Sequence, residues 1–120
     1  MSSYKDLIVW QKSYQHSLDI YYVSQKFPKE EIFGITSQIR RSAISIPSNI
    51  AEGNARGGKK EHVQFLRIAF GSGAELETQL MLCRDLNLIN KEDYNRINIL
   101  LTEVLKMLAG LIKSINKSSI

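Results

Sequence analysis

The sequence predicts an all-α protein, an antiparallel up-down-up-down four-helix bundle, on three observations. Apolar residues recur every three or four positions over nearly the whole chain, which is the period of an α-helix. The segments that interrupt this period are short and contain most of the glycines and prolines. Short connections join helices that pack as antiparallel neighbours. We expect a single domain over residues 1–120, with helices at about 4–26, 29–54, 59–86 and 91–116.

Length and composition fit one domain that folds without a metal or a disulfide. A chain of 120 residues buries roughly two-thirds of its unfolded surface on folding. The single Cys83 has no partner in the chain, which favours a reduced, cytoplasmic protein. No apolar run is long enough to cross a membrane, and no signal segment follows Met1. We expect no cofactor and no membrane contact.

The first predicted helix carries an aromatic stripe. Ser3 with Asp6 resembles a capping box at its start, and Phe27 before Pro28 ends it, because a residue before proline is pushed out of α geometry. Aromatic side chains can stack on nucleobases, but stripes at helical spacing more often form a core, and we expect this one to be buried. Its members are Trp10, Tyr14 and Tyr21, on the helix face that they share with Leu7 and Leu18.

The second predicted helix contains a proline, with Pro28 suited to its first turn. Its apolar phase continues through Pro47, which favours one helix kinked there, with the carbonyl of Ala43 freed. Ser45 and Ser48 lie close enough in sequence to help satisfy the freed groups. The alternative is two shorter helices that meet at Pro47. The phase is set by Ile32, Ile35, Ile39, Ala43, Ile46 and Ile50, and the segment 53–58 closes the helix and turns the chain.

The third and fourth helices carry more apolar surface than one core stripe uses. In the third, Gly71 and Gly73 each cost about 1 kcal/mol relative to alanine, which predicts close approach of a neighbouring helix. Asn90 is the expected cap of the fourth helix. A wide apolar arc on the fourth helix predicts burial on two sides, and hence a homo-oligomer. The extra apolar residues are Leu100, Leu105, Met107 and Ile112.

The basic charge is concentrated in one segment. The formal net charge is +4, and residues 40–67 account for all of it, with six basic and two acidic side chains. Such an excess predicts a polyanion partner, and the alternative is a solvated basic corner. The candidate nucleic-acid contacts are Arg40, Arg41, Arg56, Lys59, Lys60 and Arg67.

No pattern in the sequence supports catalysis or metal binding. The stretch 53–60 matches a phosphate-binding loop except that Lys60 replaces the magnesium-binding Ser or Thr, and no strand precedes it. The sequence GSGAEL at 71–76 lacks the third glycine of a dinucleotide fingerprint. His16 and His62 lack the Glu-x-x-His spacing of di-iron bundles, and we expect both at the surface or its boundary. We predict a non-enzymatic protein without a metal.

Residues 40–80, which read RRSAISIPSNIAEGNARGGKKEHVQFLRIAFGSGAELETQL, resemble a known family. Its members are encoded in intervening sequences of bacterial 23S ribosomal RNA genes. The opening YKDLIVWQKSY and the turn at 87–94 also fit, so the resemblance covers nearly the whole chain. It implies an antiparallel four-helix bundle that assembles into a ring-like homopentamer. The family name records where the genes were first found and does not show that this chain binds ribosomal RNA.

A related group, the accessory proteins of diversity-generating retroelements, forms positively charged pentameric barrels. Those proteins are thought to bind nucleic acid and a reverse transcriptase, so the resemblance implies RNA, DNA or a reverse transcriptase as possible partners here.

The resemblance also implies that the segment around Pro47 is a structural signature rather than a catalytic site. Arg40 and Arg41 are then phosphate contacts or, equally, structural partners of Glu75. Glu75 and Glu77 are themselves either solvated or paired with these arginines or a neighbouring subunit. The residues matched to the family pattern are Arg40, Arg41, Pro47, Asn49, Glu52, Gly53 and Glu75.

Two functions follow as hypotheses. The first is an oligomeric protein that binds RNA or DNA through the basic patch without strong sequence specificity. The second is an oligomeric protein–protein adaptor or scaffold that has no nucleic-acid role.

Overall fold

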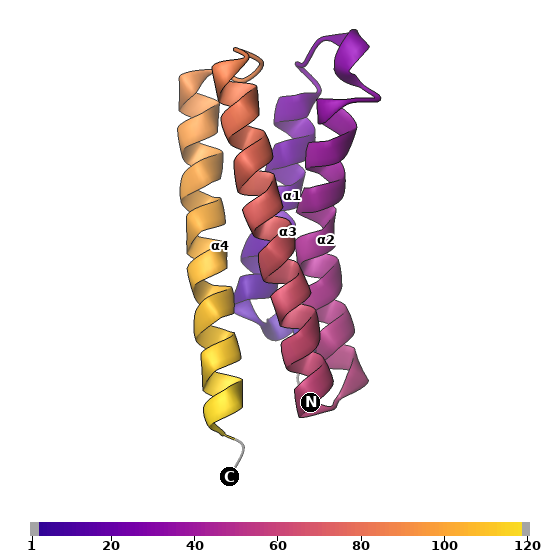
Figure 1. The fold of residues 1–120 in the computed structure, drawn as a ribbon, viewed down its shortest axis with the longest axis vertical. Coiled ribbons are helices and arrows are strands. Elements are labelled where there is room, and N and C mark those ends of the chain that lie inside the picture. The colour runs from indigo at the N-terminus through magenta and orange to yellow at the C-terminus, as the bar shows by residue number, and fades with distance from the viewer. Residues whose placement is uncertain (1–2, 119–120) are drawn as a thin grey trace.

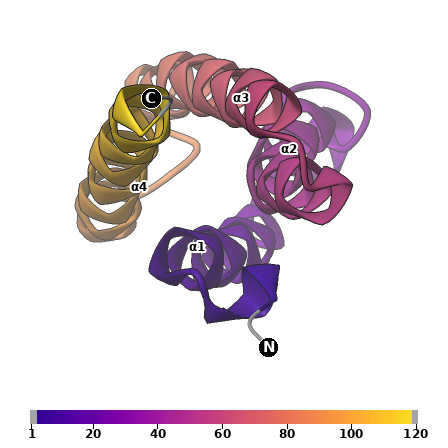
Figure 2. The same ribbon diagram turned by 90° about the horizontal axis from the view of Figure 1, so that it is seen from below.

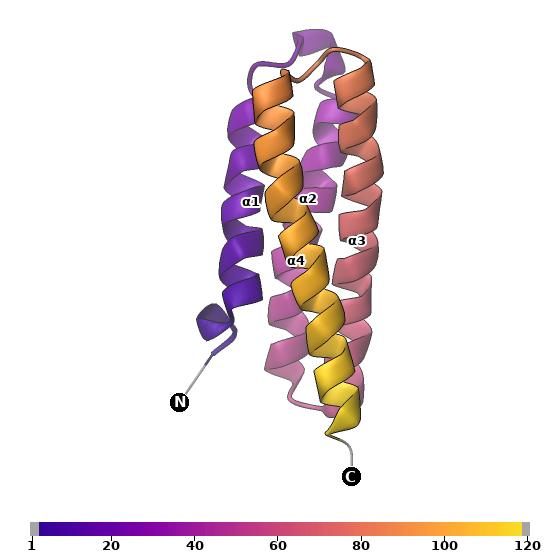
Figure 3. The same ribbon diagram turned by 90° about the vertical axis from the view of Figure 1, so that its left-hand side faces the viewer.

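Four long helices lie side by side along one axis (Figure 1). The structure is a computed structural model and describes residues 3–118. The elements are η1 (Tyr4–Asp6), α1 (Ile8–Ser24), η2 (Lys29–Glu31), α2 (Ile35–Arg56), α3 (Lys59–Asp85) and α4 (Lys91–Lys117), with η denoting a short 3₁₀ helix. Consecutive helices run in opposite directions, and α1 lies beside both α2 and α4 (Figures 2 and 3). The predicted all-α bundle is confirmed, and its extents are 51 × 21 × 20 Å.

The core runs along the bundle axis and uses the periodic residues of α2, α3 and α4. Most apolar residues that recur every three or four positions in these three helices are buried, although Phe70 on α3 is 38% exposed. Asn90 caps α4 as expected, because its side chain accepts a hydrogen bond from the backbone N–H of Asp93 at 2.8 Å. The largest fully buried apolar side chains are Ile20, Ile39, Ile46, Ile50, Leu66, Leu76, Leu80, Ile97, Leu101 and Leu108.

The aromatic stripe of α1 is only partly buried: Trp10 packs against the core as predicted, but the prediction is wrong for the two tyrosines. Tyr14 and Tyr21 are exposed, and the buried face of α1 is instead Val9, Ser13, His16, Ser17, Ile20, Val23 and Ser24. Three serines on this face let α1 approach α2 closely, which large aromatic rings would prevent. Tyrosine also keeps its hydroxyl solvated when it stays near the surface. The stripe therefore lies along the open edge between α1 and α2.

The first two helices are shorter at their starts than predicted. The Ser3–Asp6 capping box forms, but it caps η1, and extended backbone at Leu7 separates η1 from α1. In the second helix, residues 29–31 form only η2. Gly34, with φ −111° and ψ −118°, has non-helical backbone geometry, so α2 begins only at Ile35. Ile32 is consequently exposed rather than part of the core.

Helix α2 continues through Pro47, so the alternative of two helices meeting there is wrong. The kink itself stays a prediction. Proline lacks the N–H that would bind the carbonyl of Ala43. The hydroxyl of Ser17 on α1 lies 3.1 Å from that buried oxygen and donates to it, whereas Ser45 and Ser48, the expected partners, do not. Ser17 Oγ is also 3.0 Å from the carbonyl of Ser13, so its one proton is shared between two acceptors.

Glycine permits close helix contact at Gly73, one of the two positions where it was predicted, and also at Gly53, where it was not. A Cβ at Gly53 would lie 2.8 Å from Cβ of Phe65, and one at Gly73 would lie 2.5 Å from Cδ2 of Leu105. Gly71 faces open space, so its predicted role in packing is wrong for the single chain. Gly53 lies inside α2, not at its end. The turn is made by Gly57, whose φ of 78° is in the left-handed region that favours glycine.

Candidate nucleic-acid interface

The six candidate basic residues do not form one patch. Arg40 and Arg41 lie in the second turn of α2, whereas Arg56, Lys59 and Lys60 surround the α2–α3 turn. The rise of an α-helix separates Arg41 from Arg56 by about 22 Å along α2. The sequence places them within one basic segment, but the continuous helix α2 holds them apart.

Arg40 is held against α1. Its Nε donates to the hydroxyl of Ser24 at 2.8 Å, and its guanidinium carbon lies 4.7 Å from the centre of the Tyr21 ring. These contacts fix α2 against α1 and leave the terminal guanidinium nitrogens available, with no ion pair to a carboxylate among residues 3–118. Arg40 is therefore a half-buried structural cation at the edge of the bundle.

Arg41 is exposed, and Glu75 does not pair with it. Glu75 Oε1 instead accepts a hydrogen bond from Ser42 at 3.2 Å, across the α2–α3 contact. Within the described chain neither Arg40 nor Arg41 forms an ion pair with Glu75, so the intramolecular pairing that the sequence left open is absent. Glu77, which is half-buried, also forms no ion pair within residues 3–118.

The seam between α2 and α3 continues with other polar contacts. Asn49 Nδ2 donates to the Ser45 carbonyl at 2.8 Å and lies 2.9 Å from Ser45 Oγ. The hydroxyls of Ser45 and Ser72 are 2.8 Å apart across the two helices. Asn49 therefore holds Ser45, whose hydroxyl makes the contact with α3.

Arg56 is largely neutralised by its neighbours. Its Nε donates to Glu52 at 2.9 Å, and a second nitrogen lies 3.5 Å from Glu61. The hydrogen bond and charge of Glu52, with a smaller contribution from Glu61, raise the pKa of Arg56. Its guanidinium also lies 4.9 Å from the centre of the Phe65 ring. Arg56 therefore stabilises the α2–α3 turn, and its positive charge is largely offset by Glu52 and Glu61.

Lys59, Lys60 and Arg67 remain exposed on the first two turns of α3 and just beyond. None of the three forms an ion pair within the described part of the chain. Arg67 lines a shallow groove of about 410 Å³ together with Ile112 on α4. This contact brings the end of α4 beside the start of α3.

Two further lysines join this group from the end of α4. Lys113 follows Ile112 in sequence, and Lys117 is one turn further on; both are exposed. Sequence reasoning missed both, because it assigned the charge excess to residues 40–67. The predicted antiparallel pairing of α3 with α4 places the end of α4 beside the start of α3. That topology could therefore have located both lysines near Lys59 and Lys60.

The charge of the whole chain is divided unevenly along the bundle. Contacts between Ser45 and Ser72 and between Lys12 and Glu103 mark the middle of the helices. We call residues 3–16, 45–72 and 103–118 the turn half, and residues 17–44 and 73–102 the loop half. The turn half has nine basic and four acidic side chains, a net +5, and the loop half has seven and eight, a net −1.

The described residues hold no candidate catalytic or metal centre. No group of three or more His, Cys, Asp or Glu residues is arranged to hold a metal ion in residues 3–118. Cys83 is buried, and burial raises the pKa of its thiol to about 11. His62 is half-buried as expected, but His16 is buried, so its predicted surface position is wrong.

His16 lies in the core between α1 and α4. Burial lowers the pKa of His16 to about 4, against the raising effects of the Ile97 carbonyl and the charge of Asp19. Neither ring nitrogen has a hydrogen-bond partner with ordinary geometry. The side chain is therefore a neutral packing residue at pH 7.

Comparison with known proteins identifies the family. A family model described as 23S rRNA-intervening sequence protein matches residues 5–110. The chain belongs to this family. Comparison with curated proteins gives no significant match.

A crystal structure of another protein with the same architecture supports this assignment. It is a protein of unknown function from the S23 ribosomal protein family of Bacteroides thetaiotaomicron. The match has a TM-score of 0.82 and 31% sequence identity, and it covers 88% of this chain and 96% of that one. The 23S rRNA-intervening sequence family thus accounts for the fold, whereas any activity must be argued from the surface.

Among residues 3–118, no helix of this family member combines the length and the apolar content that spanning a bilayer requires.

Proposed function

We propose that this chain is a non-enzymatic, oligomeric protein that binds RNA or DNA through the turn half of the bundle. The observation that carries this proposal is the charge division, a net +5 in the turn half against −1 in the loop half. Lys59, Lys60 and Arg67, with Lys113 and Lys117, supply cations that form no ion pair within residues 3–118. Contacts of this kind recognise phosphates and carry little sequence information.

Assembly would strengthen this interaction. A homopentamer, which the family resemblance implies, places five copies of the basic turn half in one particle. Several weak contacts on one polymer gain from a high effective concentration. A reverse transcriptase or another protein can then occupy surfaces that the nucleic acid leaves free.

The test is binding measured by fluorescence anisotropy, with a structured RNA and a duplex DNA over a series of salt concentrations. The wild type is compared with Lys59→Glu/Lys60→Glu. The matched control is Lys29→Glu/Lys91→Glu, which makes the same charge change in the loop half. We expect salt-sensitive binding that the first variant loses and the control retains, with helicity and assembly mass unchanged.

A second candidate function is a protein–protein adaptor, which specific exposed apolar residues favour. Phe33, between η2 and α2, is 97% exposed, and Ile99 on α4 is 71% exposed. Absence of nucleic-acid binding at low salt, together with a copurifying protein that Phe33→Ser releases, would favour the adaptor and overturn the first proposal.

A further inference from the structure

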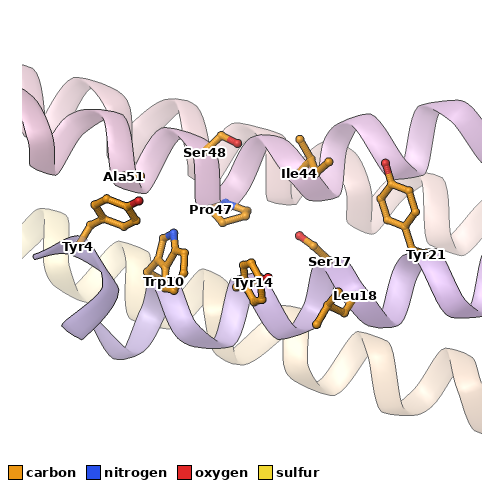
Figure 4. A pocket seen from close by; sticks show the side chains of 10 residues that line it. All are labelled: Tyr4, Trp10, Tyr14, Ser17, Leu18, Tyr21, Ile44, Pro47, Ser48 and Ala51. Atoms are coloured by element: carbon orange, nitrogen blue, oxygen red, sulfur yellow. The ribbon is translucent and has the colours of Figure 1, made fainter.

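The displaced aromatic stripe lines an open groove between α1 and α2. The groove has a volume of about 380 Å³, and its walls are the aromatic side chains of η1 and α1 and the apolar face of α2 around Pro47 (Figure 4). Tyr14 is 50% exposed and Tyr21 is 37% exposed along it. If the stripe were buried, packing in the core would explain these tyrosines. In the observed structure their rings are partly open to solvent along the groove.

The rings at one end of the groove are already arranged by mutual contact. Trp10 and Tyr14 are stacked, with ring centres 5.1 Å apart and planes inclined by 29°. Tyr4 meets Trp10 edge-on at 5.3 Å. Across the groove stand Pro47 and Ala51, which offer an apolar wall without a charge. Flat, apolar surfaces spaced along a groove suit flat, apolar groups.

The other end of the groove is cationic. The guanidinium of Arg40 lies over Tyr21, which lines the groove, at 4.7 Å from the ring centre. Arg41 is exposed one turn before Ile44, another lining residue. Neither arginine forms an ion pair with a carboxylate among the described residues. This end favours an anionic partner.

The acids closest in sequence to the lining residues form hydrogen bonds or ion pairs within the chain. Asp6 accepts a hydrogen bond from the Ser3 backbone, Asp19 lies 3.5 Å from Arg96, and Glu52 pairs with Arg56 at 2.9 Å. The groove therefore presents unneutralised positive charge at the Arg40 end, and Asp6 near the other end is the one of these three acids without an ion pair within residues 3–118.

The groove also lies between the two basic groups that α2 separates. Its α2 wall, from Ile44 to Ala51, lies between Arg41 and the α2–α3 turn. The exposed cation Arg41, a row of aromatic rings and, past the ion-paired Arg56, the exposed Lys59 and Lys60 thus follow one another along the molecule. Cations attract phosphates, and the aromatic rings between them can stack on bases. This arrangement indicates a partner in which phosphates alternate with flat bases.

We propose that this groove binds unpaired nucleotides of a single-stranded nucleic acid. Bases stack on the exposed faces of Tyr14 and Tyr21, and phosphates contact Arg40 and Arg41. Aromatic side chains on a basic track are a common way to bind single strands without sequence preference. In a duplex the base faces are stacked on each other, so they are not available to stack on the tyrosine rings. The inference rests on the proposed nucleic-acid function and adds a preference for single strands.

The chain carries its own reporter for the test, because Trp10 is its one tryptophan and lies in the groove. The probes are a 12-nucleotide oligo(dT) and a blunt DNA hairpin of the same number of nucleotides, whose loop is a non-nucleotide linker so that every base is paired. We expect oligo(dT) to quench the fluorescence of Trp10, since a thymine stacked on Tyr14 lies close to the indole and accepts an electron from its excited state. The hairpin is expected to bind without this quenching.

Variants then separate the groove from the turn half in anisotropy titrations. Tyr14→Leu and Tyr21→Leu remove a ring and keep an apolar side chain, and each is expected to weaken oligo(dT) binding about tenfold. Hairpin binding is expected to stay unchanged. The matched control is Tyr22→Leu, because Tyr22 is 59% exposed and does not line the groove. Arg41→Glu, at an exposed site that folding does not need, should also weaken oligo(dT) more than the hairpin.

The outcomes distinguish this inference from the proposed function. If Lys59→Glu/Lys60→Glu abolishes binding while the groove variants change nothing, the groove site is wrong and the proposed function stands. If no probe binds the wild type at low salt, both fail. If Tyr14→Leu changes the mass of the assembly but not the preference for oligo(dT), the groove is a contact between copies and the inference is overturned.

Discussion

At the residue scale, the hydroxyl of Ser17 replaces the backbone N–H that α2 lacks at Pro47. Ala43 is completely buried, so its carbonyl has no access to water. A buried carbonyl without a partner costs free energy, because the hydrogen bond to water is lost on folding. The Ser17 hydroxyl restores a donor from the neighbouring helix at 3.1 Å. Ser17 and Pro47 are therefore one structural unit, although they are thirty positions apart in the sequence.

We expect Ser17→Ala to lower the free energy of unfolding by about 1–3 kcal/mol, because it leaves the Ala43 carbonyl unsatisfied. Urea denaturation measures this change. In a Pro47→Ala background the new N–H satisfies the same carbonyl, so Ser17→Ala should then cost much less. Ser13→Ala is the matched control, since the Ser13 hydroxyl bonds only within its own helix, to Trp10. Equal costs of Ser17→Ala in the two backgrounds would refute the coupling.

His16 gives stability a defined pH dependence. The unfolded chain takes up a proton near pH 6.5, but in the folded chain burial lowers the pKa of His16 to about 4. The neutral form is the one that folds, so stability is complete above pH 6.5 and declines as the pH falls towards 4. The loss amounts to about 3 kcal/mol.

Chemical denaturation at a series of pH values between 7 and 4 checks this expectation. His16→Leu should flatten the profile in this range, whereas His62→Gln should leave most of the decline in place, because His62 is only partly buried. If the stability of His16→Leu still declines between pH 7 and pH 4, other titratable groups cause the decline.

At the element scale, the spacing of the helices depends on which glycines meet a neighbour. Gly53 lies where α2 crosses α3, beside the backbone carbonyl of His62 and the Cβ of Phe65. Gly73 has only the end of the Leu105 side chain in its way, and that side chain can move. Gly71 meets nothing within the chain. An added Cβ would thus meet backbone and a Cβ atom at Gly53, a movable side chain at Gly73 and no described atom at Gly71.

Gly53→Ala should therefore destabilise the protein by about 1–3 kcal/mol, because its Cβ would force α2 and α3 apart. Gly71→Ala is the matched control within a helix and should stabilise it by about 0.5–1 kcal/mol, since alanine has the higher helix propensity. Thermal and urea unfolding of both variants test the contrast. Stabilisation by Gly53→Ala would show that the two helices have room to spare.

At the scale of the whole molecule, the charge division makes binding a property of one end. Each lysine that contacts a phosphate releases a counterion from the nucleic acid, so binding weakens as salt rises. Lys59→Glu/Lys60→Glu should therefore reduce the slope of log K against log salt concentration by about 2 for duplex DNA. An unchanged slope, with Lys29→Glu/Lys91→Glu as the comparison, would place the phosphate contacts elsewhere.

The sequence by itself determined the class of the protein and most of its core. Helical periodicity located the four helices, and the apolar rows of α2, α3 and α4 are buried largely as predicted, because spacing by three and four residues fixes one face of a helix. The capping residues Ser3 and Asn90 also act through hydrogen bonds a few positions away. Local rules apply directly where the interactions that matter are local.

Only the tertiary structure decided which face of α1 is buried, what satisfies the Ala43 carbonyl, and where the basic charge gathers. Periodicity on α1 fits two faces, and the small serines, not the aromatic rings, allow the close packing with α2. The partner of Ala43 and the lysines beside Lys59 come from helices that are distant in sequence. Contacts between chain segments depend on how the helices are packed, and a pattern of single residues along the chain does not contain that information.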